Sequence, residues 1–190
     1  MDIVFYFLPF VVVVLFGWYF QIEWRYLLLG IPPFIIALFL ERYIVLDFST
    51  IIFLIIIAPV IEETLKFFST IAKKDKKTGV AVGLMFAGFE NMIYFISFSY
   101  SFLLVFWLRE LSDPILHSTT TSIATRTWKG KILGGIGLAI LMHSFWNFFS
   151  LLIINDYYLI WILAGIYFMA ETIFVNEIKL KNKKKLKIWN

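Results

Sequence analysis

Six polar side chains that could activate water or bind a metal ion occur inside apolar stretches of this sequence. They are Glu62, Glu63, Glu90, His117, His143 and Asn147. Carboxylates facing imidazoles in a water-filled cavity suit hydrolysis, with a glutamate as the general base and His or Asn donors stabilising the oxyanion of a tetrahedral intermediate. The same side chains could instead bind a divalent metal ion whose water attacks the substrate. The residue types alone are compatible with both chemistries.

Each of these residues also has a structural interpretation. Glu62 and Lys66 are four residues apart and could form a helix-stabilising ion pair, and His143 could form a hydrogen bond between helices. A second carboxylate at Glu63, with no second cation nearby, argues against the ion pair alone. Glu90 needs a partner, because a lone carboxylate is costly inside a membrane. We favour a functional site because the set contains both histidines of the protein.

Pro59 stands just before the paired glutamates and should loosen the helix there. It has no N–H, so the carbonyl of Ile55 is left without its helical partner. Glu62 and Lys66 share one helical face, whereas Glu63 is rotated by about 100° and still reaches Lys66 three residues on. We therefore expect Glu62 to be tied to Lys66 and Glu63 to be freer to meet groups from other helices.

The ionisable residues must converge, because burying them singly in a membrane is expensive. A central charge costs roughly 2.5 to 3.5 kcal/mol on translocon scales. Four of them, on four different apolar stretches, lie about 8 to 13 residues from the nearest basic segment, or roughly 12 to 20 Å along a helix. These four are Glu63, Glu90, His117 and His143. Small residues that allow close helix packing accompany them, namely Gly79, Gly83, Ala87, Gly134, Gly135 and Gly137.

The elements that position these residues are expected to be transmembrane helices. Hydrophobic residues make up 61% of the 190, charged residues only 16%, and the mean hydropathy is +0.87, which excludes an ordinary soluble fold. We predict an all-α bundle forming a single integral membrane domain over residues 1–190, with a protease-like core at 58–150. About seven spans are expected, at Ile3–Phe20, Trp24–Leu40, Phe48–Ala72, Gly79–Phe98, Phe102–Thr125, Ile132–Ile154 and Tyr157–Ile178.

The formal charge of +4 reflects topology signals rather than nucleic-acid binding. Basic residues follow the third, fifth and seventh predicted spans, at 73–77, 126–131 and in the tail 179–190. By the positive-inside rule all three segments are cytoplasmic, as is the loop containing Arg25. We therefore predict a protein of the cell membrane with a cytoplasmic C-terminus and an external N-terminus, whose lysine tail contacts anionic lipid.

Other hydrolytic chemistries lack their residues. The absence of cysteine excludes thiolate nucleophiles and cysteine metal ligands. The sequence contains no HExxH, GxSG or GxGD motif. The Ser/Thr run 118–122 is expected to provide packing or cavity lining, and Arg109, Glu110 and Asp113 are expected to be interfacial or structural, outside the inner site.

The glutamates and histidines resemble the motifs of one family. Glu62–Lys66 matches the EExxK motif of PrsW-type intramembrane proteases, Phe86–Glu90 matches their FxxxE, and His117 and the His143-xxx-Asn147 segment match the later motifs. Gly88–Tyr94 and Arg109 strengthen the likeness, which covers about residues 58–150. The resemblance implies an intramembrane metallopeptidase that cuts membrane-anchored regulators such as anti-sigma factors. The wider superfamily includes type II CAAX prenyl proteases and a γ-secretase scaffold subunit.

Two departures from the prenyl proteases limit the transfer of roles. Those enzymes have EExxxR and FxxxH, whereas here Lys66 comes one residue earlier and Glu90 replaces the histidine. A prenylated substrate is therefore disfavoured, and the base remains either Glu62 or Glu63. We expect Glu90 and His117 to position the water or a metal. The residues expected to act as oxyanion donors or ligands are His143 and Asn147.

If a metal ion is used, Glu63, Glu90, His117 and His143 are the expected ligands, a set that suits zinc. The expected partners are a membrane-anchored protein or peptide and the lipid bilayer, without nucleic acid. Two rival functions remain. One is a non-catalytic membrane scaffold of the same superfamily, and the other is a transporter or proton relay, although the sequence shows no inverted repeat with paired broken helices.

Overall fold

The computed structural model describes residues 7–44, 49–71, 73, 75–97, 103–126 and 132–154. Side chains are described throughout these ranges except at 103–109, 126, 132–133 and 152–154. Every element in this part of the chain is helical, as predicted. The elements are α1 (Leu8–Tyr19), α2 (Trp24–Leu27), η2 (Leu28–Gly30), α3 (Ile31–Ile44), α4 (Thr50–Ile52), η3 (Phe53–Ile57), α5 (Ala58–Thr70), α6 (Lys76–Ser97), α7 (Leu103–Arg126) and α8 (Ile132–Ile154).

Three stretches are long and apolar enough to cross a membrane. They are Trp24–Ile44, Lys76–Ser97 and Gly134–Leu151, and they coincide with the second, fourth and sixth predicted spans. A stretch of about 20 apolar residues is what a bilayer requires. The described chain is therefore compatible with a membrane protein.

The other predicted spans differ from these three for identifiable reasons. Helix α1 is apolar but has only 12 residues within the described range. The helical stretch from Thr50 to Thr70 contains Glu62, Glu63 and Lys66, and α7 likewise contains several charged residues. Charge thus lowers the hydropathy of two of the four helices that carry the candidate site residues, α5 and α7. The seventh predicted span, at 157–178, and the lysine tail lie outside the described residues.

Polar and apolar side chains are distributed opposite to the pattern of a soluble protein. Large apolar side chains such as Trp18, Phe39 and Phe68 are at least 60% exposed on the outside of the bundle. Charged side chains such as Glu63 and Lys66 are completely buried inside it. Charged residues are almost never fully buried in soluble proteins, and extensive exposed apolar surface marks contact with lipid or a partner. This distribution supports a membrane location.

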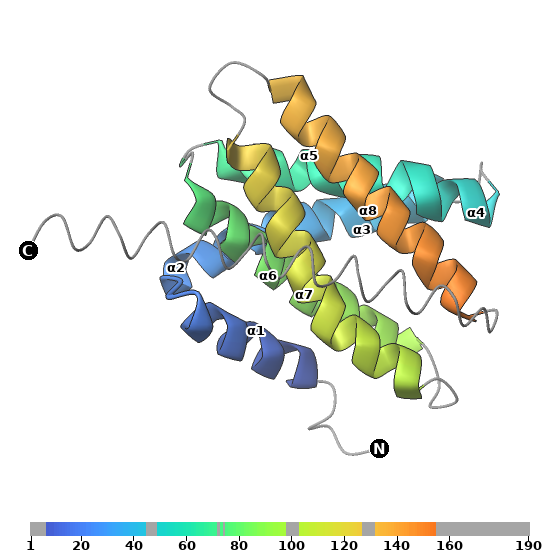
Figure 1. Cartoon of the computed structure of the whole chain (residues 1–190), viewed down its shortest axis with the longest axis horizontal. Helices are drawn as coiled ribbons and strands as arrows, with labels where there is room; N and C mark the ends of the chain where they lie inside the picture. Colours follow the sequence, from blue (N-terminus) through green and yellow to red (C-terminus); the bar gives the residue numbers. More distant parts are fainter. Residues whose placement is uncertain are drawn as a thin grey trace, which may run out of the picture.

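Helix α6 lies at the centre of the packing and contacts α7 most extensively, as well as α1, α3 and α5 (Figure 1). Two of its glycines make the contact with α7 possible. A Cβ on Gly83 would lie 2.2 Å from the carbonyl oxygen of His117, and one on Gly79 would lie 2.9 Å from Cα of Ser122. The predicted close packing at these glycines is confirmed. At Gly134 and Gly137 no described atom lies within 4 Å of a Cβ placed there, so close packing at these two positions stays a prediction.

The helical stretch that ends in α5 contains a widened turn just before the glutamates. The segment η3 is a π-helix, in which the N–H of Ala58 donates to the carbonyl five residues earlier. The next bond of this pattern would require an N–H from Pro59 to the carbonyl of Leu54, and proline has none. The Nδ2 atom of Asn147, on α8, donates to that carbonyl instead at 2.8 Å. The predicted loosening at Pro59 is thus present, but it affects Leu54 rather than Ile55.

Candidate functional site

A cluster of buried ionisable side chains lies where α5, α6, α7 and α8 meet. Its members are Glu62, Glu63 and Lys66 from α5, Glu90 from α6, His117 from α7 and His143 from α8. All are at most 5% exposed except Glu90, whose side chain is 16% exposed. The structure thus brings together five of the six residues singled out in the sequence, and the sixth, Asn147, lies beside them. Burial of so many charges requires compensation between them.

One oxygen of Glu63 is bound by three donors. Its Oε1 lies 2.6 Å from Nζ of Lys66, 2.9 Å from Nδ1 of His143 and 3.1 Å from the hydroxyl of Thr120, which donates to it. These donors come from three different helices, so this carboxylate ties α5 to α7 and α8. The expectation that Glu63 would be the less constrained glutamate is wrong. Lys66 lies closer to Glu63, three residues before it, than to Glu62, four residues before it.

Glu62 is the less constrained of the two glutamates. Its Oε2 lies 3.7 Å from Nζ of Lys66 and 3.9 Å from Nδ1 of His143, and it accepts no hydrogen bond from any described residue. Its side chain is only 7% exposed. A buried carboxylate oxygen without a hydrogen bond is costly, so it marks a position where a water, a proton or a ligand is expected.

His117 connects the lysine to Glu90. Its Nδ1 lies 2.5 Å from Nζ of Lys66, and its Nε2 lies 2.7 Å from Oε2 of Glu90. A lysine ammonium group can only donate, so Nδ1 must be the acceptor and the ring proton is assigned to Nε2, which donates to Glu90. Both nitrogens of His117 therefore already have partners. The ammonium group also lies 4.5 Å from the centre of the Phe86 ring, a favourable cation–π position.

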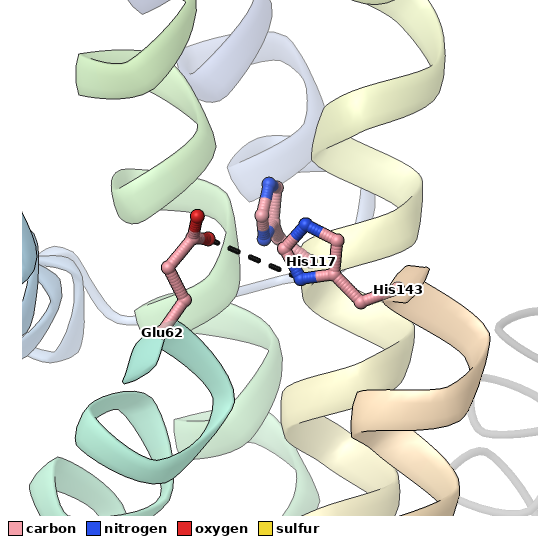
Figure 2. A group of neighbouring side chains, drawn as sticks. All are labelled: Glu62, His117 and His143. Atoms are coloured by element: carbon pink, nitrogen blue, oxygen red, sulfur yellow. Dashed lines mark ion pairs between the residues drawn. The ribbon is translucent and has the colours of Figure 1, made fainter. Parts of the chain in front are cut away.

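His143 presents one ring nitrogen that the network does not use. Its Nδ1 faces the Glu63 carboxylate at 2.9 Å, so the proton is assigned to Nδ1 and Nε2 becomes an acceptor. The ring meets that of His117 edge to face, with centroids 4.9 Å apart. Figure 2 shows Glu62 and the two imidazoles pointing toward one another from three helices. An unprotonated imidazole nitrogen beside a carboxylate is suited to accept a proton or bind a metal ion.

A buried group of Glu62, His117 and His143 could hold a metal ion, since one ligand atom from each lies within 4.8 Å of the others. Glu62 thus takes the place that the sequence-based ligand set gave to Glu63, and Glu90 is bound to His117 instead. Nitrogen and oxygen ligands about 2.0 to 2.2 Å from zinc would have to lie closer together than 4.8 Å. A metal ion on Nδ1 of His117 would also have to displace the Lys66 ammonium group. The carboxylates outnumber the one ammonium in the described cluster, so the charge of a divalent ion would fit.

A cavity of about 130 Å³ adjoins the cluster on the side of α3. Its polar lining consists of Glu41, Glu62, Glu90, Tyr94 and Asn147. Sequence reasoning missed Glu41, which looked like a charge at the end of a span. Its spacing contained a usable signal, because Phe34, Ala37 and Glu41 stand at i, i+3 and i+7 on one helical face, and the first two are buried. Because Phe34 and Ala37 are buried on this face of the helix, Glu41, which follows them on the same face, also points into the bundle.

Other polar residues of α7 are buried rather than interfacial. Glu110 and Asp113 are both fully buried, and Nε1 of Trp146 on α8 donates to Oδ1 of Asp113 at 3.0 Å. Of the two alternatives expected for these residues, interfacial or structural, the structural one fits their burial. The side chain of Arg109 lies outside the described residues. The Ser/Thr run is buried against α6 and α5, as predicted, and Ser118 donates to the carbonyl of Pro114.

No protein-family model matches this chain, and searches of curated proteins and of solved structures also found no match.

Proposed function

We propose that this protein is an intramembrane protease in which Glu62 is the general base. The observation that carries the proposal is the position of Glu62: a buried carboxylate oxygen without a hydrogen bond, 3.9 Å from an imidazole, at the wall of a cavity. A water molecule between the carboxylate and the imidazole would be activated by proton transfer. The resemblance to PrsW-type proteases supports the same reading.

The proposed reaction is hydrolysis of a peptide bond by this water. The water gives a proton to the Glu62 carboxylate as its oxygen bonds to the carbonyl carbon of the substrate. The proton then passes from Glu62 to the amide nitrogen, and the C–N bond breaks to leave a carboxylic acid and an amine. The Nδ2 atom of Asn147 has a second N–H besides the one given to Leu54, and this donor at the cavity wall suits the oxyanion.

Glu63, Lys66, His117 and Glu90 act as the supporting framework in this proposal. Glu63 and His117 hold the Lys66 ammonium group between them, and its charge lowers the cost of a second negative charge on Glu62. Glu63 also fixes His143 through Nδ1 and thereby keeps Nε2 as an acceptor. The base is therefore assigned to Glu62 rather than to the glutamate that carries the most hydrogen bonds.

Zinc would be held by Glu62, His117 and His143 if the enzyme uses a metal, and it would supply a Lewis acid and a water that ionises more easily. The close approach of Lys66 to His117 favours the metal-independent alternative, since the ammonium already takes Nδ1.

We also propose the orientation in which the C-terminus is cytoplasmic, which rests on the three basic segments of the sequence. The cavity then opens toward the external half of the membrane, because Glu41 stands near the end of the span that begins at the Arg25 loop. A reporter fused after Asn190 should be active on the cytoplasmic side, and activity only on the outer side would reverse this orientation.

A non-catalytic scaffold is the second candidate function, and the Glu63–Lys66–His117–Glu90 network, which links α5, α6 and α7, favours it. Such a network holds the three helices together without any reaction. The scaffold does not require an unbonded carboxylate at Glu62, however. The role of Glu62 therefore distinguishes the two candidates.

The test is cleavage of a panel of single-span membrane substrates by purified protein in lipid nanodiscs. Glu62→Gln should reduce cleavage by about 10² to 10⁴-fold, because the amide has nearly the same volume but cannot accept the proton. Glu23→Gln is the matched control, since Glu23 is an exposed glutamate paired with Arg25 outside the site. The melting temperature of both variants should stay near that of the wild type.

The same assay with excess chelator separates the two forms of the mechanism. Unchanged cleavage supports direct action by Glu62, whereas loss of cleavage that Zn²⁺ restores supports the metal-bound form. Absence of cleavage in the wild type across the panel would remove the protease proposal and leave the scaffold. Full cleavage by Glu62→Gln would exclude Glu62 as the general base.

A further inference from the structure

The cavity beside the cluster is lined by three carboxylates from three different helices. Glu41 comes from α3, Glu62 from α5 and Glu90 from α6. Two of their oxygens, Oε1 of Glu41 and Oε2 of Glu62, are buried and accept no hydrogen bond from any described residue. Acidic side chains that are brought together without such partners repel one another, and each is stabilised by a positive charge in the space between them.

The cation already present in the described site compensates the carboxylates of this cavity only in part. The ammonium group of Lys66 is bound to Glu63 at 2.6 Å and to His117 at 2.5 Å, and it remains 3.7 Å from Glu62. It faces the α7 and α8 side of the cluster, whereas Glu41 lines the cavity from α3. The carboxylates of the cavity thus need a shared proton or a positive charge from elsewhere.

The spacing of the carboxylates favours an organic cation over a metal ion. Among the described residues, the group whose ligand atoms converge within 4.8 Å is Glu62 with the two histidines, and Glu41 and Glu90 do not belong to it. A cavity of about 130 Å³ is also larger than a bare ion requires. An ammonium or guanidinium group is a larger cation whose several N–H donors can reach carboxylates on different walls.

The apolar lining of the cavity fits the rest of such a side chain. Phe34, Phe53 and Phe86 contribute aromatic surface to the same space as the carboxylates. Lysine and arginine combine a hydrocarbon stem, which packs against apolar surface, with a charged end that requires polar partners. Aromatic rings can also attract the cation directly through their faces.

We propose that this cavity binds a lysine or arginine side chain of the polypeptide substrate, with Glu41 as a specificity-determining residue. The proposal rests on the protease function above and adds the substrate class to it. The basic side chain lies between Glu41 and Glu90, and this places the neighbouring peptide bond beside Glu62 and Asn147. Glu41 is assigned to substrate binding rather than to proton transfer, since it lines the cavity from α3 and His143 is not among the lining residues.

The experiment measures binding rather than cleavage. Pairs of fluorescent single-span peptides carry either one lysine or norleucine, which has the same stem without the ammonium group, at each position along the span in turn. At one position at least, the lysine peptide should bind to wild-type protein in nanodiscs about tenfold or more tightly than its norleucine partner. Glu41→Gln should abolish most of this difference, and Glu23→Gln should preserve it.

Equal binding of lysine and norleucine peptides at every position would overturn the proposal, and this comparison needs no variant to fold. Binding of free n-butylammonium without any lysine preference would assign the cavity to small amines and would also overturn it. An undiminished lysine preference in folded Glu41→Gln would exclude Glu41 as the specificity residue. A lysine preference without cleavage of any peptide would instead contradict the proposed protease function and support the proposed cation-binding cavity.

Discussion

The two sides of the buried cluster are built differently. On the closed side, α6 and α7 touch backbone to backbone at Gly79 and Gly83, and Glu63 accepts three hydrogen bonds on one oxygen. On the open side, toward α3, a π-helical turn leaves a carbonyl that a side chain from α8 satisfies, and Glu41 and Glu62 line a cavity. The same helix, α5, supplies adjacent glutamates to the two sides.

This difference separates the residues that hold the structure from those that can react. A side chain that already has its hydrogen-bond partners is not stabilised further by a substrate, and its removal leaves buried groups without partners. A side chain that lacks partners contributes less to stability and has free capacity for a ligand. Changes on the closed side should therefore mainly reduce stability, and changes on the open side should mainly reduce activity.

Glu63→Gln should have the largest effect on stability. It removes the negative charge that compensates Lys66 in a fully buried site, and breaking such a pair typically costs about 3 to 5 kcal/mol. Glu62→Gln is the matched change on the open side and should cost less than about 1 kcal/mol, since Oε2 of Glu62 accepts no hydrogen bond from any described residue. Reversible unfolding in mixed micelles measures both values. Equal losses would mean that the two sides do not differ as described.

Gly83→Ala should have the next largest effect. Its new Cβ would lie 2.2 Å from the carbonyl oxygen of His117, so α6 and α7 must separate, at a cost of about 1 to 3 kcal/mol. Gly137→Ala is the control, because no described atom lies within 4 Å of its Cβ. That variant should be as stable as the wild type or gain up to about 1 kcal/mol from the better helix propensity of alanine. Thermal unfolding of the two variants compares them directly.

Asn147→Ala should have a smaller effect on stability than Gly83→Ala, and a local one. It leaves the carbonyl of Leu54 without its donor, which should cost about 1 kcal/mol. Hydrogen exchange should become faster at the amides of residues 53–58 and stay unchanged in α1, which serves as the internal reference. Unaltered exchange in the π-helical turn would show that the amide of Asn147 does not support it. The cleavage rate should fall as well if the second N–H of Asn147 binds the oxyanion.

Much of the site could be predicted from the sequence, because the cost of buried charge leaves few alternatives. Glu90, His117 and His143 stand at similar depths on separate apolar stretches. Contact between them lowers the cost of burying each one, and the structure brings them together. The helical class follows equally directly from the length of the apolar runs. The close contact at Gly83 follows from the absence of a side chain at a position within such a run.

The details that could not be predicted depend on which way a side chain points from its helix rather than on how far along the helix it stands. Helical spacing allows both Glu62 and Glu63 to reach Lys66, and the choice between them is made by His143 and Thr120 from other helices. Glu41 was missed because a charge at the end of a span usually faces water. Gly134 and Gly137 have the composition of a packing motif, but the sequence does not specify which helix, if any, lies against them.

The π-helical turn also sets the register of the chain around the site. It contains one residue more than an α-helical turn, so the residues before it are offset relative to α5 by about 100°, one residue's rotation. Deleting one residue between 53 and 57 would restore an ordinary α-helix and turn the preceding stretch by that angle. Phe53 would leave the cavity wall. After deletion of residue 55, 56 or 57, the residue four positions after Leu54 would be Pro59, so the carbonyl of Leu54 would still depend on Asn147 for a donor. A single-codon deletion could thus reshape the binding space while every ionisable side chain of the cluster stayed in the sequence.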